Sequence, residues 1–138
     1  MTQKTLKRNF FQRLLGRPAT QLPDNNDFWE YKDGQVIFLL DKVPQLSIPS
    51  GAVRLEGKGL PKNILVVFGE DQQYHAFHNK CAHGGRCLDP VPGTQTLQCC
   101  SVGKSTYDYE GNLLSGSATG PIEVLAIQQE KGELLILL

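Results

Sequence analysis

From Phe28 onward the chain consists of short runs rich in β-branched and aromatic residues, separated by turns that contain glycine or proline. Short strands at this even spacing are typical of an antiparallel sandwich or small barrel. We therefore predict an all-β fold. The predicted strands are Val36–Leu40, Ala52–Glu56, Ile64–Phe68, Gln73–Phe77, Thr96–Cys99, Ser105–Tyr109, Ile122–Ile127 and Glu133–Leu137. The predicted turns lie at Asp33-Gly34, Pro49-Ser50-Gly51, Gly69-Glu70-Asp71, Pro92-Gly93, Glu110-Gly111 and Lys131-Gly132.

The length of 138 residues suits one domain with a modest core. Residues 1–27 lack the short β-type runs of the rest of the chain. We predict that they form an arm and linker before a domain at 28–138. Within the arm, apolar residues recur at helical spacing until Gly16 and Pro18, which predicts a short amphipathic helix. The apolar residues are Leu6, Phe10, Phe11, Leu14 and Leu15.

Charge is unevenly distributed along a chain whose formal net charge is zero. Residues 1–18 carry five basic residues and no acidic one, so the remaining body is mildly acidic. Two interpretations of this arm are compatible with the pattern: its apolar face packs on the domain, which we favour, or residues 4–17 contact a membrane surface or partner. The chain has no basic stripe typical of nucleic-acid binding, so we expect no nucleic-acid partner. It has no apolar run of about 18 residues, so we expect a cytoplasmic protein without a spanning helix.

Two segments combine residues that bind metals. The first is Cys81-Ala82-His83-Gly84-Gly85 and the second is Cys100-Ser101-Val102-Gly103. Glycines after the histidine allow the backbone to turn tightly around a bound group. Four cysteines in a chain of this size, with no signal-peptide pattern, indicate metal or redox chemistry before a disulfide framework.

Both segments resemble the ligand loops of Rieske iron–sulfur domains, whose patterns are C-x-H-x-G and C-P-x-H-G-S-x-(F/Y)-D. In that family two thiolates hold one iron and two imidazoles hold the other. Ser105, Tyr107 and Asp108 fall in register with the end of the second pattern. Gly103 then stands where the second histidine belongs, and glycine has no side chain to ligate a metal. The resemblance covers about residues 34–138.

The resemblance implies a Rieske-like fold with a two-loop cluster-binding subdomain at about residues 79–110. It also implies a [2Fe-2S] cluster in which Cys81 and Cys100 hold one iron and His83 helps to hold the other. In the family, the second-loop serine and aromatic hydroxyl donate hydrogen bonds to the cluster, which gives that role to Ser105 and Tyr107.

The fourth ligand stays open, because Cys87 and Cys99 are both additional to the pattern. One of them replaces the histidine, or both pair in a disulfide like the loop disulfide of some Rieske proteins, or three cysteines and His83 bind zinc. Adjacent residues on a strand point to opposite faces, so Cys99 and Cys100 cannot both face the site on a straight strand. This slightly favours Cys87 as the substitute. His75 and His78 are interpreted as ordinary strand residues.

We therefore expect a small soluble carrier of one electron, similar to Rieske-type ferredoxins. Its partners would be a reductase and an oxidoreductase acceptor, and it would act as an electron-transfer component rather than as a stand-alone enzyme. A separate oxygenase iron centre is not expected, because the chain has three histidines and no room for a second domain. Two alternatives stay open: a cluster-free Rieske fold that serves as an interaction or regulatory subunit, and a zinc-stabilised binding module.

Overall fold

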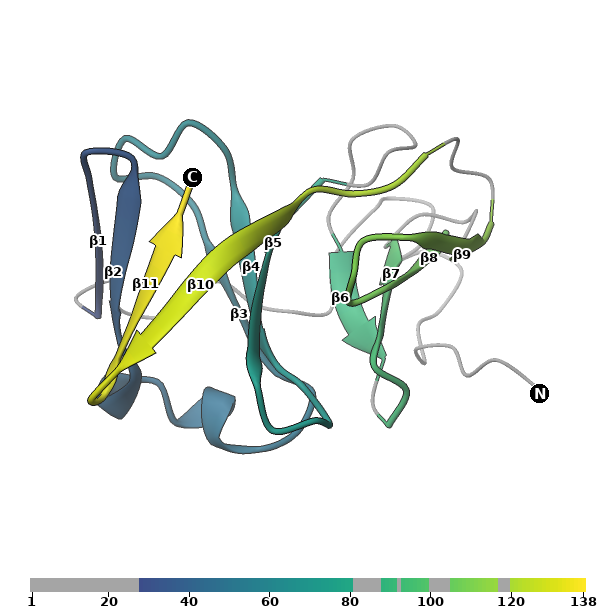
Figure 1. The fold of residues 1–138 in the computed structure, drawn as a ribbon, viewed down its shortest axis with the longest axis horizontal. Coiled ribbons are helices and arrows are strands. Elements are labelled where there is room, and N and C mark those ends of the chain that lie inside the picture. The colour runs from purple at the N-terminus through teal and green to yellow at the C-terminus, as the bar shows by residue number, and fades with distance from the viewer. Residues whose placement is uncertain (1–27, 81–87, 92, 100–104, 117–119) are drawn as a thin grey trace.

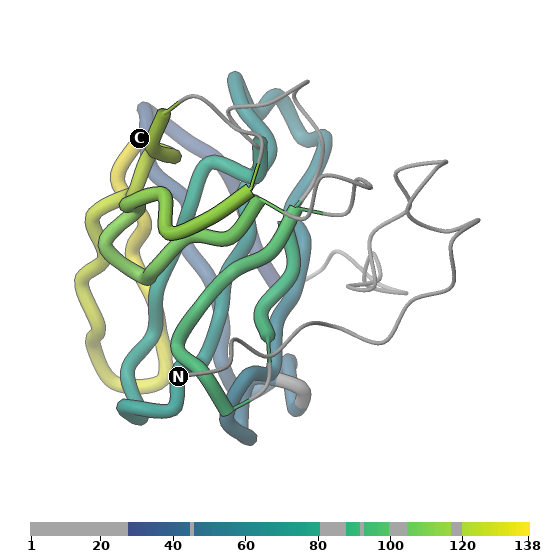
Figure 2. The backbone as a smooth tube through the Cα atoms, turned by 90° about the vertical axis from the view of Figure 1, so that its right-hand side faces the viewer, coloured from purple at the N-terminus to yellow at the C-terminus, as the bar shows by residue number. Residues whose placement is uncertain are grey.

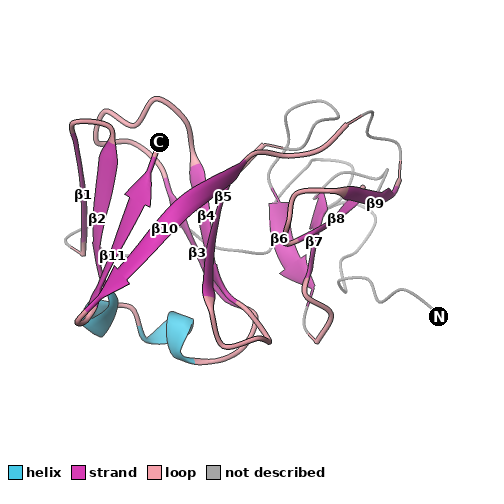
Figure 3. Cartoon of the chain, in the orientation of Figure 1, coloured by secondary structure: helices cyan, strands magenta, loops and turns pink. Residues whose placement is uncertain are grey.

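The computed structural model describes residues 28–80, 88–91, 93–99, 105–116 and 120–138, the side chain of residue 45 excepted. Within these ranges the chain forms eleven strands in two antiparallel sheets, and its helical segments are two short 3-10 turns, η1 (Leu40–Lys42) and η2 (Pro44–Ser47) (Figure 3). The all-β prediction is confirmed. The predicted amphipathic helix falls in residues 1–27, outside the described residues. Among the described residues, no helix has the length and hydropathy needed to span a membrane.

The larger sheet has seven strands in the order β1-β2-β11-β10-β5-β4-β3. They are β1 (Trp29–Lys32), β2 (Gln35–Leu39), β3 (Gly51–Leu55), β4 (Ile64–Phe68), β5 (Tyr74–His78), β10 (Val124–Glu130) and β11 (Glu133–Leu137). The first hairpin turns at Asp33 and Gly34, whose φ angles are 52° and 77°. A two-residue turn with positive φ at both positions matches the strand twist and favours Asp-Gly, as predicted.

The smaller sheet has four strands in the order β6-β7-β8-β9. They are β6 (Leu88–Val91), β7 (Thr96–Cys99), β8 (Thr106–Asp108) and β9 (Leu113–Ser115). The chain leaves the large sheet after β5 and returns to it as β10, which pairs with β5, so the small sheet is an insertion between two neighbouring strands. The two sheets stand side by side in Figure 1, and the small sheet lies in front of the large one in Figure 2.

Strand β4 is buried on both faces and separates two hydrophobic clusters. Ile64 and Val66 belong to the cluster within the large sheet, whereas Leu65 and Val67 belong to the one between the sheets. Side chains alternate across a strand, so a continuous apolar run is what a doubly buried strand requires. The cluster between the sheets, called here the inter-sheet cluster, consists of Leu65, Val67, Phe77, Leu88, Leu97, Cys99, Tyr107, Tyr109 and Ile122.

A polar bridge joins the sheets at the end of β4. The Glu70 Oε1 atom accepts hydrogen bonds from the Ser50 hydroxyl (3.0 Å) and from the Gly93 N–H (2.9 Å). The Asp71 N–H donates to the Gln95 side-chain oxygen at 3.0 Å. The turn between β4 and β5 is thereby tied to the turn between β6 and β7, which fixes the small sheet against the large one.

Three strands escape the sequence prediction: β1, β6 and β9. Strand β6 contains Pro90, which counts against a strand in sequence. However, β6 is an edge strand, where the missing N–H of proline breaks no ladder bond. Strand β9 has three residues and an irregular register with β8, which leaves little periodicity to detect. The predicted bounds of Ile64–Phe68, Thr96–Cys99 and Glu133–Leu137 match the observed strands.

Candidate metal-binding site

The borders of the two predicted ligand segments meet at one end of the small sheet. Leu88, which follows residues 81–87, is the cross-strand partner of Cys99, which precedes residues 100–104. The Cys99 N–H donates to the Ser105 carbonyl at 2.7 Å, and this bond closes the base of the second segment. The strand register therefore places the end of the first segment beside the start of the second.

Asn79 brings the remaining border to the same place. It lies just after β5, and its Oδ1 atom accepts a hydrogen bond of 2.7 Å from the Leu88 N–H. Its own backbone N–H donates to the Asn63 carbonyl at 2.9 Å. Only 4% of Asn79 is exposed. Sequence reasoning missed this residue, because one asparagine between a strand and a loop carries no spacing signal.

Gly116 packs against the backbone of Ser105. Its φ angle is +104°, and a Cβ atom added to it would overlap the Ser105 Cα atom and lie 2.8 Å from the Ser105 nitrogen. An L-residue would be strained there by both its backbone angle and this contact. The residue is thus needed as glycine for the chain after β9 to pass directly beside the end of the second segment.

The predicted site residues divide into two groups. Cys99, Ser105 and Tyr107 are described, and all three are fully buried. The other predicted metal ligands, Cys81, His83, Cys87 and Cys100, lie outside the described residues together with Gly103. Within the described ranges, no three or more His, Cys, Asp and Glu side chains gather as a metal site. The ligand set therefore stays a prediction.

His78 ends β5, beside the first segment. Its Nδ1 atom lies 3.7 Å from the Glu123 Oε1 atom, which also forms a salt bridge of 2.6 Å with the Lys62 Nζ atom. Burial lowers the pKa of His78 below 6.5, and Lys62 and Lys80 lower it further, against the opposing effect of Glu123. A hydrogen bond from Lys62 lowers the pKa of Glu123. At neutral pH the imidazole is therefore uncharged while the carboxylate is paired with Lys62.

His75 lies about 10 Å from His78 along the strand. Its Nε2 atom is 3.0 Å from the Asp71 Oδ2 atom, and its ring centroid is 4.7 Å from that of Tyr109. The Tyr109 hydroxyl is buried and has no hydrogen-bond partner in the described part of the chain. Burial, with the nearby Asp71 and Glu70 carboxylates, raises the pKa of Tyr109 to about 12. This cluster lies beside the turn between β4 and β5, away from the borders of the ligand segments.

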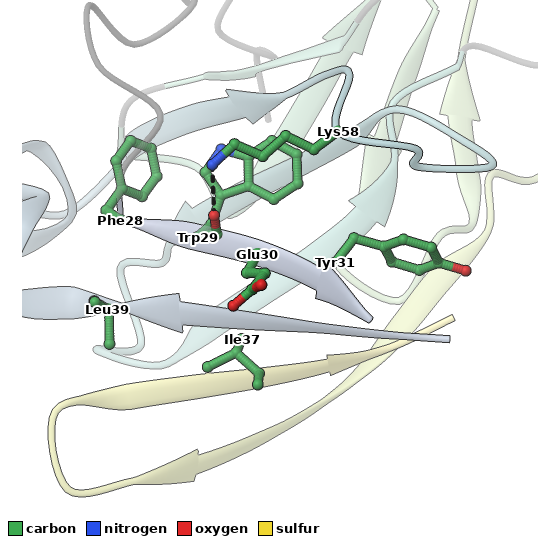
Figure 4. Close-up of a pocket in the computed structure, with 7 residues that line it drawn as sticks. All are labelled: Phe28, Trp29, Glu30, Tyr31, Ile37, Leu39 and Lys58. Atoms are coloured by element: carbon green, nitrogen blue, oxygen red, sulfur yellow. Dashed lines mark hydrogen bonds between the residues drawn. The ribbon is translucent and has the colours of Figure 1, made fainter. Parts of the chain in front are cut away.

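A hollow of about 600 Å³ lies over the edge strand β1. Figure 4 shows the Lys58 side chain reaching over the Trp29 ring, with the ammonium group 4.8 Å from the ring centroid and hydrogen-bonded to the Trp29 carbonyl at 2.7 Å. Lys58 thereby covers part of an exposed strand edge. Strand β1 stands at the far side of the large sheet from β6–β9 (Figure 1), so this hollow is separate from the segment borders.

The sequence profile of the Rieske [2Fe-2S] domain matches residues 38–126, which include both predicted ligand segments. The chain belongs to the Rieske [2Fe-2S] domain family. The resemblance seen in the sequence is thus confirmed. The comparison with curated protein sequences found no match to the sequence of this chain.

Solved structures share the fold at low sequence identity. The ferredoxin of carbazole 1,9a-dioxygenase from Nocardioides aromaticivorans IC177 is 16% identical, with a TM-score of 0.58 over 73% of this chain and 93% of that one. The plasma membrane Rieske protein PetC3 from Synechocystis PCC 6803 is 20% identical, with a TM-score of 0.53 over 62% and 85%. The quaternary ammonium Rieske monooxygenase CntA matches at 21% identity and a TM-score of 0.53 over 67% of this chain but 29% of its own length.

The described residues of this Rieske domain are compatible with a cluster bound between two segments. Asn79 lies two residues before the first segment, and its Nδ2 atom is buried and has no hydrogen-bond partner in the described part of the chain. Donors of this kind stabilise metal-bound sulfur atoms. Two thiols and one imidazole of the family pattern are present as Cys81, Cys100 and His83, and these are ligands that iron–sulfur clusters use. Among the four ligand positions only Gly103 departs from the pattern, and in the second segment Ser101 and Lys104 replace its proline and its glycine.

Proposed function

We propose that this Rieske domain is a small carrier of one electron, or a redox subunit, with an atypically ligated [2Fe-2S] cluster. The observation that carries the proposal is the pairing of Leu88 with Cys99, which brings together the end of the first ligand segment and the start of the second. Cys81 and Cys100 would hold one iron, and His83 with a fourth ligand would hold the other.

When bound, such a cluster supplies reversible one-electron chemistry. The surrounding side chains hold and shield the site. Ser105 and Tyr107 are fully buried, and in the proposed role their hydroxyl groups donate to cluster sulfur atoms. The inter-sheet cluster packs under the small sheet and excludes water from its inner face. His78 is uncharged at neutral pH and so adds no positive charge beside the first segment.

We propose Cys87 as the fourth ligand. The alternative, Cys99, is fully buried in the inter-sheet cluster, together with Leu97 on its own strand and Leu88 on the neighbouring strand. A thiolate in that apolar environment would be costly to desolvate, so Cys99 fits better as a core residue. A thiolate at position 87 in place of an imidazole would add negative charge and lower the reduction potential.

The expected partners are a reductase that donates the electron and an oxidoreductase that accepts it. Support comes from the carbazole 1,9a-dioxygenase ferredoxin and from a second solved structure, a complex of reduced oxygenase and oxidized ferredoxin in carbazole 1,9a-dioxygenase. The matched chain of that complex is 18% identical to this one, with a TM-score of 0.56. In this role the chain carries out no reaction on a substrate. A cytoplasmic location and the packing of residues 4–17 on the domain belong to the same proposal.

Gly103 favours a second candidate, a cluster-free Rieske fold that serves as an interaction or regulatory subunit. A zinc site of three cysteines and His83 is the third. Anaerobic purification followed by dithionite reduction and EPR separates them. The electron carrier gives a coloured protein that bleaches by one electron per chain and shows a signal when reduced. A colourless, EPR-silent protein that stays so after cluster reconstitution refutes it, and stoichiometric zinc supports the zinc site.

A further inference from the structure

We propose that Asn79 is a positioning residue for the first ligand segment, and that its Nδ2 group donates a hydrogen bond to a sulfur atom held there. The proposal rests on the proposed function, because the acceptor is a cysteine thiolate or a sulfide of the cluster. It is carried by the hydrogen bonds and the burial of Asn79 at the end of β5.

Leu88 fixes which way the Asn79 amide is turned. A backbone N–H group only donates, so the amide atom 2.7 Å from the Leu88 nitrogen must be the oxygen. The amide nitrogen then occupies the other branch of the side chain. Its two N–H groups need acceptors elsewhere.

The described residues supply no such acceptor. Nδ2 is buried, and it has no hydrogen-bond partner in the described part of the chain. Asn79 as a whole is only 4% exposed, so bulk water does not replace the missing partner. Because buried donors are almost always satisfied, the acceptor belongs to the segment that begins at residue 81, or to the group that this segment holds.

The backbone around Asn79 is held on both sides. Its N–H donates to the Asn63 carbonyl at 2.9 Å, and the Lys80 N–H donates to the His78 carbonyl at 2.8 Å. The second bond spans Asn79 and makes it the centre of a three-residue turn. A side chain on a fixed backbone, with its oxygen already engaged, presents its nitrogen in one direction and is preorganised for a ligand.

Sulfur is the acceptor that matches this donor. Thiolates and sulfides of a cluster carry negative charge, and N–H groups directed at them stabilise the more negative reduced state and raise the reduction potential. Asparagine serves both needs, because its oxygen accepts from Leu88 while its nitrogen donates. Aspartate would keep the first bond, lose the second and add a charge.

The test compares Asn79→Asp with Asn63→Asp in the full chain, after iron and sulfide have been measured in each. Asn63 is exposed and its carbonyl contacts Asn79, so N63D places the same charge change next door and leaves the Asn79 amide intact. We expect a lower reduction potential in N79D than in N63D. In wild-type protein labelled with nitrogen-15 in its asparagine side chains, pulsed EPR should detect a nitrogen-15 coupling that N63D keeps and N79D lacks.

Two results would overturn the proposal alone: a cluster-loaded wild type without the nitrogen-15 coupling, or equal potentials in N79D and N63D. If N79D does not retain the cluster, the wild-type coupling decides by itself. A wild-type chain that contains no iron or sulfide refutes the proposed function and this proposal with it, so the two failures are distinguishable.

Discussion

Leu88 and Cys99 are cross-strand partners at one end of the small sheet, and both are fully buried. Residues 81–87 end immediately before the first of them and residues 100–104 begin immediately after the second. A single pair in the strand register therefore brings together the end of the first segment and the start of the second, which residues 88–99 separate in the sequence. This relationship underlies every expectation about the site.

Replacing the two additional cysteines should give opposite results. Cys87→Ala is expected to abolish the cluster, because it removes the proposed fourth ligand. Cys99→Ala is expected to keep the cluster and to destabilise the fold by about 1–2 kcal/mol, because it shortens a buried side chain in the inter-sheet cluster. Iron per chain and urea unfolding measure the two effects.

The same two variants would also reveal a wrong assignment of the fourth ligand. Loss of iron in C99A with retention in C87A would make Cys99 the ligand. Retention in both variants would rule out thiolate replacement of the missing histidine.

Alanine at Gly116 should destabilise the fold by about 2 kcal/mol or more, because the position combines a positive φ with a backbone overlap at Ser105. Gly120→Ala is the matched control, since a Cβ atom there meets no atom within 4 Å. Urea unfolding compares the two variants. Equal stability of G116A and G120A would show that the chain after β9 does not pass so close to Ser105.

His78 should make stability fall in mild acid. Its folded pKa lies below 6.5, so the unfolded chain takes up a proton more readily than the folded one. The free energy of unfolding therefore decreases as the pH falls through about 6.5 and levels off below the folded pKa. His78→Gln should reduce this decrease. Urea unfolding between about pH 7.5 and 5.5 tests it, and parallel losses in wild type and H78Q would contradict it.

Lys58 should protect the edge strand β1. Its ammonium group covers the Trp29 ring and donates to the Trp29 carbonyl, so Lys58→Ala should cost about 1 kcal/mol. Because Trp29 is the single tryptophan of the chain, its fluorescence reports the change directly, and we expect a red shift. Lys32→Ala, at an exposed position on the same strand, is the control. An unchanged spectrum in K58A would contradict the assigned contact.

The sequence predicted the fold well where local chemistry decides it. Asp33-Gly34 specifies its turn, and the apolar run at Ile64–Phe68 specifies a buried strand. Strand β6 was missed because Pro90 is tolerated only through its place at a sheet edge, which is a property of the tertiary structure. Local patterns carry no information about which strands become edges.

The site was predicted through spacing, and this limits what the sequence could reveal. Ser105 and Tyr107 were predicted as site residues because they belong to a motif. Asn79 and Gly116 were missed because their importance depends on residues far away in the chain: Leu88 for the first and Ser105 for the second. The role of Cys99 also depends on its partners, since only the packed structure places it in the inter-sheet cluster.

The content of iron, acid-labile sulfide and zinc per chain, after anaerobic purification of the full chain, tests the central claim most directly. A [2Fe-2S] domain holds two iron and two sulfide ions, and we expect this stoichiometry without zinc. A folded protein that contains neither iron nor sulfide, even after reconstitution with both, would contradict the account.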